Sequence, residues 1–408
     1  MMTAYWLIAV VLVVVNLAVM PYFLFLLATA LAALLDRRHD HVPSDPSSKL
    51  LIVIPAHNEQ SGVADTVASC LASNYPSLFF GVLVIADNCD DQTAAVARAA
   101  GARVVERLDA LKKSKGYAIE YLLELLDRSG ELGLLDAVIV VDADTTIDPN
   151  LLLSFDDALR RGHDWIQAYY TVANADQSWR TRLMTYAFSL FNGVMQLGQN
   201  ALGSSAGFKG NGMCFSTRGL RRRPWRAYGL VEDMEYSWTL RVAGEQILFR
   251  PDVKVFGAML SSGGDDSANQ RRRWEFGRSE IRNKYLGPLL TSPDLGFREK
   301  VLSACELTIP SMAWLAILYI VVAGLDVAAH FVFVGAPYTV VRGLLLGCAA
   351  LFSVALFVYA ISPFLALRLP WKYLSSIMLF PFYLGWKLVI SLAGRPQGWI
   401  RTARETRA

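Results

Sequence analysis

The segment Ala137–Asp144 joins an apolar run to two carboxylates, and it constrains the fold more than any other part of the chain. Val138–Val141 is a β-branched run, typical of a strand buried on both faces of a parallel sheet. Asp142 and Asp144 follow at the strand end, where open parallel sheets bind ligands. Side chains two positions apart on an extended backbone point the same way, which favours a cation or a sugar hydroxyl between them. A solvated acidic turn is the alternative, because Asp-x-Asp alone is a weak motif.

Strand and helix patterns alternate before this run, which predicts an α/β domain with a doubly wound, mostly parallel sheet. The expected strands are Leu50–Ile54, Gly81–Ala86 and Arg103–Glu106, and the expected helices are Gly62–Ser73, Asp91–Ala100 and Lys115–Leu126. Polar clusters follow three of the strands, at residues 55–59, 87–91 and 142–144. Neighbouring parallel strands share their carboxyl edge, so we expect these clusters to line one crevice.

The first 35 residues contain no charged side chain. Their apolar stretch, Ala4–Leu35, exceeds the ~20 residues that cross a bilayer but falls short of the ~40 needed for two crossings. It is also too long, and too poor in basic residues at its start, for a cleavable signal peptide. We expect one transmembrane helix over residues 1–36, with Pro21 as the candidate position of a bend. Arg37 and Arg38 follow, so the positive-inside rule predicts an external N-terminus and a cytosolic next domain.

Apolar runs return in the last third of the chain, where Leu307–Leu325 and Gly343–Leu367 are long enough to cross a membrane. The basic tail is expected in the cytosol, which permits only these two further crossings. Tyr373–Gly394 is then an interfacial or re-entrant helix. Three crossings in total are predicted, and four are the alternative. The expected organisation is a transmembrane helix at 1–36, a linker at 37–48, an α/β domain at 49–290, a second membrane region at 291–394 and the tail at 395–408.

Composition narrows the class of protein. Hydrophobic residues make up 54% of the chain and charged residues only 18%, as expected for a membrane protein. The net charge of +3 gives no reason to expect a nucleic-acid partner. The cysteines are odd in number and lack paired metal-binding spacing: Cys70, Cys89, Cys214, Cys305 and Cys348. We expect free thiols in a reducing compartment and no disulfide.

The strand-end clusters resemble glycosyltransferase family 2, whose members have the GT-A fold, over about residues 48–290. The resemblance implies that the base and ribose of a nucleotide-sugar donor are held by Pro55, Asn58, Glu59 and Asp87. It also implies that Lys115 and Gly116 lie near the diphosphate, and that Asp142 and Asp144 bind the diphosphate together with Mg²⁺ or Mn²⁺. The physical chemistry agrees, because helix N-termini favour phosphate and Mg²⁺ binds through one or two carboxylates plus substrate phosphates.

Two further segments resemble family motifs near the reacting groups. Leu230–Glu235 is similar to the Thr-Glu-Asp segment, with Val231 in place of the threonine. The resemblance implies that Asp233 is the catalytic base, with Glu232 beside it. Gly207–Met213 corresponds to the glycine-rich loop between the metal site and the base. Glycine allows close backbone approach, which implies that a sugar lies near three consecutive residues of this loop, Gly210, Asn211 and Gly212.

Gln270–Trp274 matches Gln-x-x-Arg-Trp, the mark of membrane-bound synthases that make β-linked glycans or glycolipids. The resemblance implies that Trp274 packs under the acceptor sugar and that Gln270 and Arg273 contact donor or acceptor. A guanidinium suits a diphosphate. Arg271 and Arg272 are expected to face lipid, as anchors to anionic headgroups.

Two other features have open interpretations. Trp179–Leu202 is an amphipathic helix that fits a membrane surface, although a core helix is the favoured alternative. A basic patch suits a membrane-facing cytosolic surface, and it comprises Arg221, Arg222, Arg223 and Arg226.

Taken together, these resemblances imply an inverting glycosyltransferase in the bacterial inner membrane, with a cytosolic catalytic domain and a donor linked to a nucleotide diphosphate, usually UDP in this family. The first acceptor hypothesis is a growing β-glycan, with an oligomer or an export partner completing the export path. The alternative is a membrane lipid such as a ceramide or a diacylglycerol. A non-enzymatic scaffold predicts missing carboxylates, and all of them are present.

Overall fold

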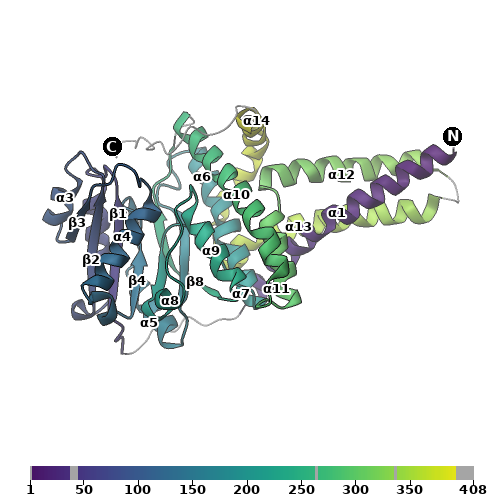
Figure 1. Ribbon diagram of the computed structural model, residues 1–408. Coiled ribbons are helices and arrows are strands. Elements are labelled where there is room, and N and C mark those ends of the chain that lie inside the picture. The colour runs from purple at the N-terminus through teal and green to yellow at the C-terminus, as the bar shows by residue number, and fades with distance from the viewer. Residues whose placement is uncertain (1, 37–44, 262–264, 335–337, 392–408) are drawn as a thin grey trace.

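The computed structural model describes residues 2–36, 45–261, 265–334 and 338–391. An α/β domain forms the wide end of the molecule, and three long helices leave it together as a rod (Figure 1). The N-terminus lies at the free end of the rod, and the sheet lies at the opposite end of the molecule. The chain therefore begins in the rod, builds the α/β domain and returns to the rod.

The first half of the sheet follows the predicted parallel pattern. Its four strands are β1 (Leu50–Ala56), β2 (Phe80–Asp87), β3 (Arg103–Arg107) and β4 (Ala137–Val140). They lie in the order β3-β2-β1-β4, and every neighbouring pair is parallel. The intervening helices are α2 (Val63–Leu71), α3 (Thr93–Ala99) and α4 (Lys115–Arg128). The sequence prediction of these elements is confirmed to within two residues at their ends.

The second half makes the sheet mixed, which the sequence did not predict. Its strands are β5 (Thr145–Ile147), β6 (Trp165–Val172), β7 (Met213–Ser216) and β8 (Ile247–Gly257), and the order continues as β4-β7-β6-β8-β5. β7 is antiparallel to both β4 and β6, and β5 is antiparallel to β8, whereas β6 and β8 are parallel. The glycine-rich loop precedes β7, and this reversed strand holds it beside the end of β4.

Two cores cover the two faces of the sheet. Successive residues of a strand point to opposite faces and so belong to different cores. Ile52 and Ile54 pack under α2 and α5 (Leu151–Arg160), whereas Leu51 and Val53 pack under α4. The second core continues without a break into the rod, where Phe23 stacks on Phe352 with ring centroids 4.2 Å apart. The rod and the face of the sheet that α4 covers are therefore one packed unit.

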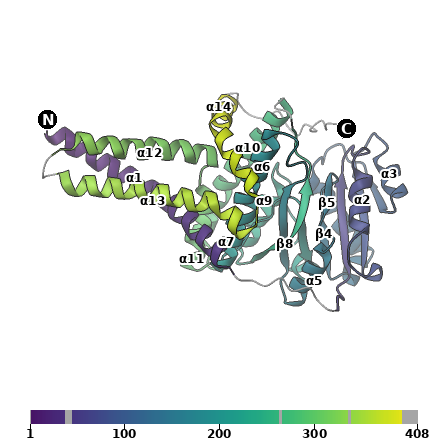
Figure 2. The same ribbon diagram turned by 180° about the vertical axis from the view of Figure 1, so that it is seen from behind.

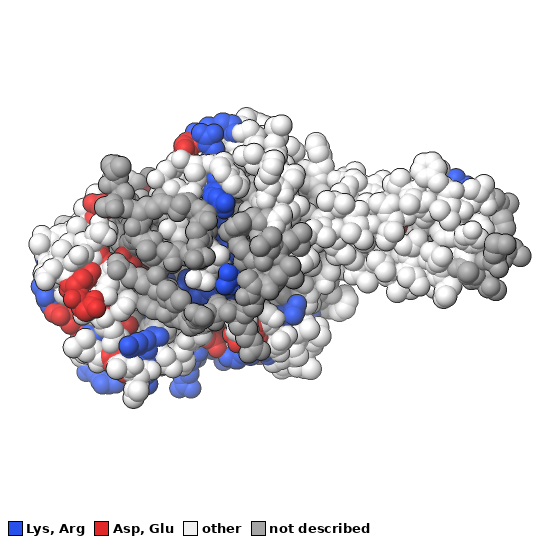
Figure 3. All heavy atoms as spheres, turned by 90° about the horizontal axis from the view of Figure 1, so that it is seen from above, with Lys and Arg blue, Asp and Glu red and all other residues white. Residues whose placement is uncertain are grey.

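The rod consists of α1 (Met2–Leu35), α12 (Met312–Val332) and α13 (Thr339–Ala366). Within the described residues, these three helices are long and apolar enough to cross a membrane, as predicted. The face of the rod drawn in Figure 3 is almost free of charged side chains, which gather on the α/β domain. One polar pair is buried in the rod, because Asn16 Nδ2 of α1 donates to Asp326 Oδ1 of α12 at 2.9 Å. α12 thus passes beyond Asp326, and it begins at Met312, after the preceding helix has ended at Thr308.

Over the expected interfacial or re-entrant helix at Tyr373–Gly394, the described residues form a 3-10 segment (Trp371–Leu379) that leads into α14 (Phe380–Ser391). Seen from behind, this unit runs beside α6 (Trp179–Phe188) and α10 (Asp265–Thr291) rather than along the rod (Figure 2). The tail at 395–408 and the linker residues 37–44 lie outside the described residues.

The segment expected at Trp179–Leu202 is a core element. It forms α6 (Trp179–Phe188), a π-helical stretch (Ser189–Val194) and α7 (Met195–Ala201). The Tyr186 hydroxyl donates to the Ala360 carbonyl at 2.8 Å, and the Tyr359 hydroxyl donates to the Leu190 carbonyl at 3.0 Å. The segment joins the sheet to α13. The remaining helices are α8 (Thr217–Arg222), α9 (Glu232–Val242), α10 (Asp265–Thr291) and α11 (Phe297–Thr308).

Candidate active site

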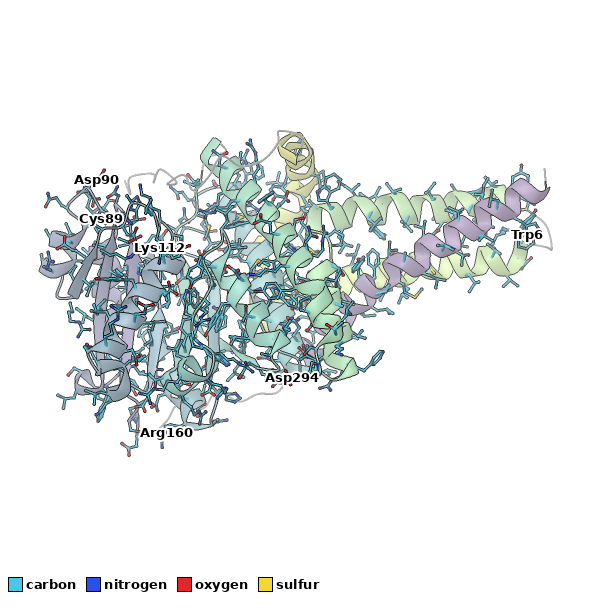
Figure 4. All side chains as sticks on the ribbon, viewed as in Figure 1. Trp6, Cys89, Asp90, Lys112, Arg160 and Asp294 are labelled. Atoms are coloured by element: carbon cyan, nitrogen blue, oxygen red, sulfur yellow. The ribbon has the colours of Figure 1, made fainter. Side chains whose placement is uncertain are left out.

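A cavity of about 1590 Å³ opens at the carboxyl edge of the parallel strands. All three polar clusters that follow β1, β2 and β4 contribute to its wall. Figure 4 shows Cys89, Asp90 and Lys112 near this edge, whereas Arg160 lies at the opposite edge of the domain. The candidate residues that line the cavity are Pro55, Glu59, Asp87, Lys115, Asp142, Asp144, Gly210, Glu232, Asp233, Gln270, Arg273 and Trp274.

Two strand-end turns form one end of the cavity and support each other. Asn58 and Asn88 have left-handed φ angles of 56° and 51°, a conformation that asparagine tolerates better than most residues. Asn58 Oδ1 accepts the backbone N–H of Asp90 at 2.9 Å, and Asn88 Oδ1 accepts that of Asp109 at 2.8 Å. These bonds fix the two turns before any ligand is bound.

Asp87 is held by a residue that the sequence analysis missed. Arg107, the last residue of β3, forms an ion pair with Asp87 at 2.5 Å, and the side chains are only 5% and 10% exposed. Arg107 Nη2 also reaches Asp109 at 3.1 Å. The available signal was weak, since β3 was predicted to end at Glu106 and one arginine after a strand carries no motif. The pair orients the Asp87 carboxylate at the cavity wall.

Lys115 begins α4 at the centre of the cavity. The Ser114 hydroxyl caps this helix by accepting the Tyr117 N–H at 3.4 Å. The Lys115 ammonium donates to the Asp142 carboxylate and to the Gly210 carbonyl. Burial opposes its charge, but Asp142 and the carboxylates of α9 outweigh burial and raise the pKa of Lys115. It is therefore a fixed cation beside the Asp-x-Asp segment.

Four candidate residues lie behind the cavity wall rather than on it. Asn58 holds its turn, as described above. Gly116 packs against the loop that precedes α9, where an added Cβ would lie 2.0 Å from the Ala227 carbonyl oxygen. Asn211 is fully buried, accepts the Asp142 N–H at 3.2 Å and donates to Thr145 Oγ1 at 2.6 Å. Gly212 has a φ of 66° and faces Val255. Their positions indicate that they support the loops of the site.

Glu232 and Asp233 occupy the first turn of α9, where the helix dipole favours negative charge. Burial raises the pKa of Glu232 to about 7, with a further rise from neighbouring Asp233 and an opposing effect of Lys115. Burial also raises the pKa of Asp233. A Cβ placed on Gly210, whose φ is 79°, would lie only 3.3 Å from Asp233 Oδ2. A proton acceptor with a raised pKa therefore faces the glycine-rich loop.

The other end of the cavity is formed by α10. Gln270, Arg273 and Trp274 line it, and the Trp274 ring lies 6.4 Å from the ring of Phe188 between centroids. Arg273 Nε is buried and has no hydrogen-bond partner among the described residues. Buried donors are rarely left unpaired, so this atom indicates a ligand position.

One of the two arginines expected to face lipid, Arg271, contacts protein side chains. Arg271 Nη1 donates to the Tyr383 hydroxyl of α14 at 2.9 Å, and its guanidinium lies 5.6 Å from the centroid of the Trp274 ring. Arg272 is half-buried.

The basic patch at α8 is likewise partly neutralised by protein. Arg222 forms ion pairs with Asp164 at 2.8 Å and with Glu245 at 2.7 Å, and Arg223 reaches Glu245 at 3.5 Å. These contacts link α8 to β6 and β8.

Asp142 and Asp144 could hold a divalent cation. The described residues contain no group of three or more His, Cys, Asp or Glu side chains arranged for a metal. A cation here would need phosphate oxygens to complete its shell, which is how Mg²⁺ commonly binds. Negative charge is nevertheless concentrated at this point, since burial and then Asp142 and Asp144 raise the pKa of Tyr170. The residues fit a metal that arrives with a diphosphate.

Comparison with known proteins agrees with this geometry. The mannosyltransferase PcManGT from Pyrobaculum calidifontis, solved in complex with GDP-Man and Mn²⁺, is similar with a TM-score of 0.51 and 14% identity, covering 87% of this chain and 97% of that one. The fold is thus an α/β GT-A fold, accompanied by three helices that could span a membrane. Residues 46–277 match the model of glycosyltransferase like family 2, and the chain belongs to this family.

One curated relative is a probable glucomannan 4-beta-mannosyltransferase 14 of Arabidopsis thaliana. It is 22% identical over 278 residues, which cover 64% of this chain and 50% of the relative. This chain therefore spans about half the length of the relative it matches. The protein is a family 2 glycosyltransferase, as the sequence motifs predicted.

Proposed function

We propose that this enzyme transfers a hexosyl group, with inversion, from a nucleotide-diphosphate sugar to a hydroxyl of an acceptor that enters from the membrane side. The observation that carries the proposal is the single cavity. It joins the strand-end turns at Glu59 and Asp87, the base candidate Asp233, and the end of α11 directly before α12. Donor, reacting groups and membrane-side entrance thus share one space.

The reaction is a single in-line displacement. Asp233 removes the proton of the acceptor hydroxyl as its oxygen attacks the anomeric carbon, and the nucleoside diphosphate leaves with the bonding electron pair. The raised pKa of Asp233 matches this role, because a stronger base at neutral pH takes the proton more readily. One displacement inverts the anomeric carbon, so an α-linked donor gives a β product.

The leaving diphosphate carries the developing negative charge. The Lys115 ammonium lies beside Asp142 and would contact the phosphate oxygens at the start of α4. Arg273 offers a buried donor from the opposite wall. A divalent cation held by Asp142 and Asp144, Mg²⁺ or Mn²⁺, would supply further charge stabilisation when bound. The similar mannosyltransferase was solved with Mn²⁺ and GDP-Man, which supports testing GDP-linked donors beside the UDP-linked donors usual in the family.

Two acceptors are supported by different observations. A growing β-glycan fits the Gln-x-x-Arg-Trp resemblance and the glucomannan named in the plant relative. An oligomer or an export partner would then complete the export path, because three candidate spanning helices are found in the part of the chain that the structure describes. A membrane lipid fits the position of the cavity end beside α12. In either case we propose a bacterial inner-membrane enzyme with its catalytic domain in the cytosol, as the basic residues after α1 suggest.

The test uses the purified full chain in lipid nanodiscs. UDP- and GDP-linked hexoses are supplied with Mg²⁺, with Mn²⁺ or with EDTA, and product is followed in the lipid and polymer fractions. The expected result is a β-linked product that disappears with EDTA. An α-linked product, or near-normal transfer by Asp233→Asn, would refute the mechanism.

A further inference from the structure

The membrane-side end of the cavity carries positive charge that the donor-binding groups do not use. Lys209, in the glycine-rich loop, and Arg278, on α10, both line the cavity there. A Cβ placed on Gly207 would lie 3.8 Å from the Lys209 ammonium and 3.9 Å from Glu306 Oε1. Lys209 thus sits between the base Asp233 and Glu306, the two carboxylates that act on its charge.

These cations are incompletely neutralised. Lys209 forms no side-chain hydrogen bond or ion pair with any residue the structure describes. Arg278 Nη2 donates only to backbone carbonyls, those of Ile309 at 2.8 Å and Glu306 at 3.3 Å. The neighbouring Glu306 carboxylate is already engaged, because it accepts from the Arg241 guanidinium and from Gln199 Nε2 at 2.7 Å.

The environment makes this charge costly without a ligand. Burial lowers the pKa of Lys209 and of Arg278, and nearby carboxylates only partly offset the effect. Removing a charge from water without a close partner costs free energy, which an anion bound between the two cations would recover. The site is thus suited to a phosphate or a carboxylate.

The position of the site identifies the side from which such a ligand comes. The two carbonyls bound by Arg278 belong to the end of α11 and to the residue after it, and α12 begins at Met312. Phe191 and Met195, on the segment that packs against α1 and α13, also line the cavity, and the next residue, Gln196, accepts the Gly207 N–H of the glycine-rich loop at 2.7 Å. Apolar walls and unpaired cations therefore meet next to two helices that could span the membrane.

We propose that Lys209 and Arg278 form an anion-binding subsite that selects a phosphate-bearing membrane lipid as the acceptor. This inference rests on the proposed function and selects its lipid acceptor over the glycan. The phosphate lies between the two cations, the acyl chains follow the apolar wall towards α12, and a hydroxyl of the headgroup reaches Asp233.

The experiment compares two acceptors that differ in the phosphate. Dioleoylglycerol and dioleoylphosphatidylglycerol both carry free hydroxyls, and only the second has a phosphate. Each is placed in phosphatidylcholine nanodiscs with the full-length enzyme, and transfer of labelled hexose to each lipid is measured by mass spectrometry. We expect kcat/KM to be about tenfold higher for the phosphatidylglycerol, as one charge-assisted contact typically provides.

Three variants separate the subsite from general damage. Lys209→Gln and Arg278→Gln should each reduce the preference for phosphatidylglycerol over dioleoylglycerol about fivefold or more, chiefly by raising the acceptor KM. Arg278→Lys keeps a cation at this position and should retain part of the preference that Arg278→Gln loses. Arg282→Gln is the matched control, because Arg282 is exposed on the same helix one turn further on. Its preference should equal that of the wild type.

Different experimental outcomes would refute the anion-binding subsite and the proposed glycosyltransferase function. Equal transfer to both lipids, or equal loss with both lipids in Lys209→Gln, would overturn the subsite while leaving the glycosyltransferase intact. A charge preference seen only between acidic and neutral oligosaccharides would overturn the lipid assignment. A rise of the donor KM alone in Lys209→Gln would assign this lysine to the diphosphate instead. No transfer from any donor to any acceptor would refute the proposed function itself.

Discussion

The two ends of the cavity differ in how their charges are satisfied. At the donor end, charged side chains are paired within the protein: Asp87 with Arg107, and Asp142 with Lys115. At the acceptor end, Lys209 and Arg278 lack carboxylate partners among the described residues, and Arg273 Nε lacks any hydrogen-bond partner there. The donor end is therefore organised before binding, whereas the acceptor end is electrostatically incomplete until a ligand arrives.

The difference follows from the elements that build each end. Parallel strands and their tight turns form the donor end, and each strand end is held by hydrogen bonds to its neighbours. Helices α10 and α11 form the acceptor end, close to the rod. Substitutions at the donor end should therefore damage folding, and those at the acceptor end should damage function alone.

The largest effect is expected where the two ends meet, at the base. Asp233→Asn should lower transfer about 10³-fold, since a positioned general base contributes about 10²–10⁴-fold. The measurement is the initial rate of glycosylated product, with donor affinity recorded in parallel. Asp127→Asn, an exposed carboxylate on α4, is the matched control and should retain full rate. A loss below tenfold would mean that another group takes the proton.

At the donor end, Arg107→Met should lower the free energy of unfolding by about 3 kcal/mol, because it leaves the buried Asp87 carboxylate without its cation. Denaturant unfolding of the detergent-solubilised protein measures this loss. The double variant Arg107→Met with Asp87→Leu removes both charges and should recover most of the stability. If the single variant unfolds like the wild type, the claim that the donor end is organised by internal ion pairs is wrong.

The pH dependence separates chemistry from stability at the base. The raised pKa of Glu232, about 7, and that of Asp233 keep both groups protonated at acid pH. Their contribution to stability is full below about pH 4, the unfolded value; that of Glu232 is lost as pH rises through about 7, and that of Asp233 as pH rises through its own raised pKa. Transfer needs deprotonated Asp233, whose pKa is raised by burial, so kcat/KM should rise by up to about tenfold per pH unit until the pH passes that raised pKa, while stability declines. An acid limb near pH 4 would contradict the raised pKa values.

How much of this could be read from the sequence depends on the kind of signal. The parallel strands were predictable because β-branched runs such as Val138–Val141 have a strong local period. The mixed half was not, because the four residues of β7 and the three of β5 are too short to show one. The direction of β7 depends on its partners in space, which no local pattern encodes.

The candidate site divides in the same way. Carboxylates at strand ends, such as Asp142 and Asp144, can be identified in the sequence by their position, and the structure brings them to the cavity. Arg107 could not be identified in this way, because its role depends on a partner 20 residues away in the chain. Gly116 shows what a motif leaves out, because the motif places this glycine beside a lysine but does not indicate its close packing against Ala227.

The smallest effect on stability is expected at the acceptor end, from replacing an arginine by methionine as in Arg107→Met at the donor end. Arg273→Met removes a guanidinium whose Nε has no partner in the described protein, so the free energy of unfolding should change by less than about 0.5 kcal/mol. Transfer should nevertheless fall, because the buried donor is then missing when the diphosphate or acceptor is bound. Denaturant unfolding and initial rates of this variant, set beside those of Arg107→Met, compare the two ends directly. Equal destabilisation by the two substitutions would mean that both ends depend on protein contacts alone, and the contrast between them would not hold.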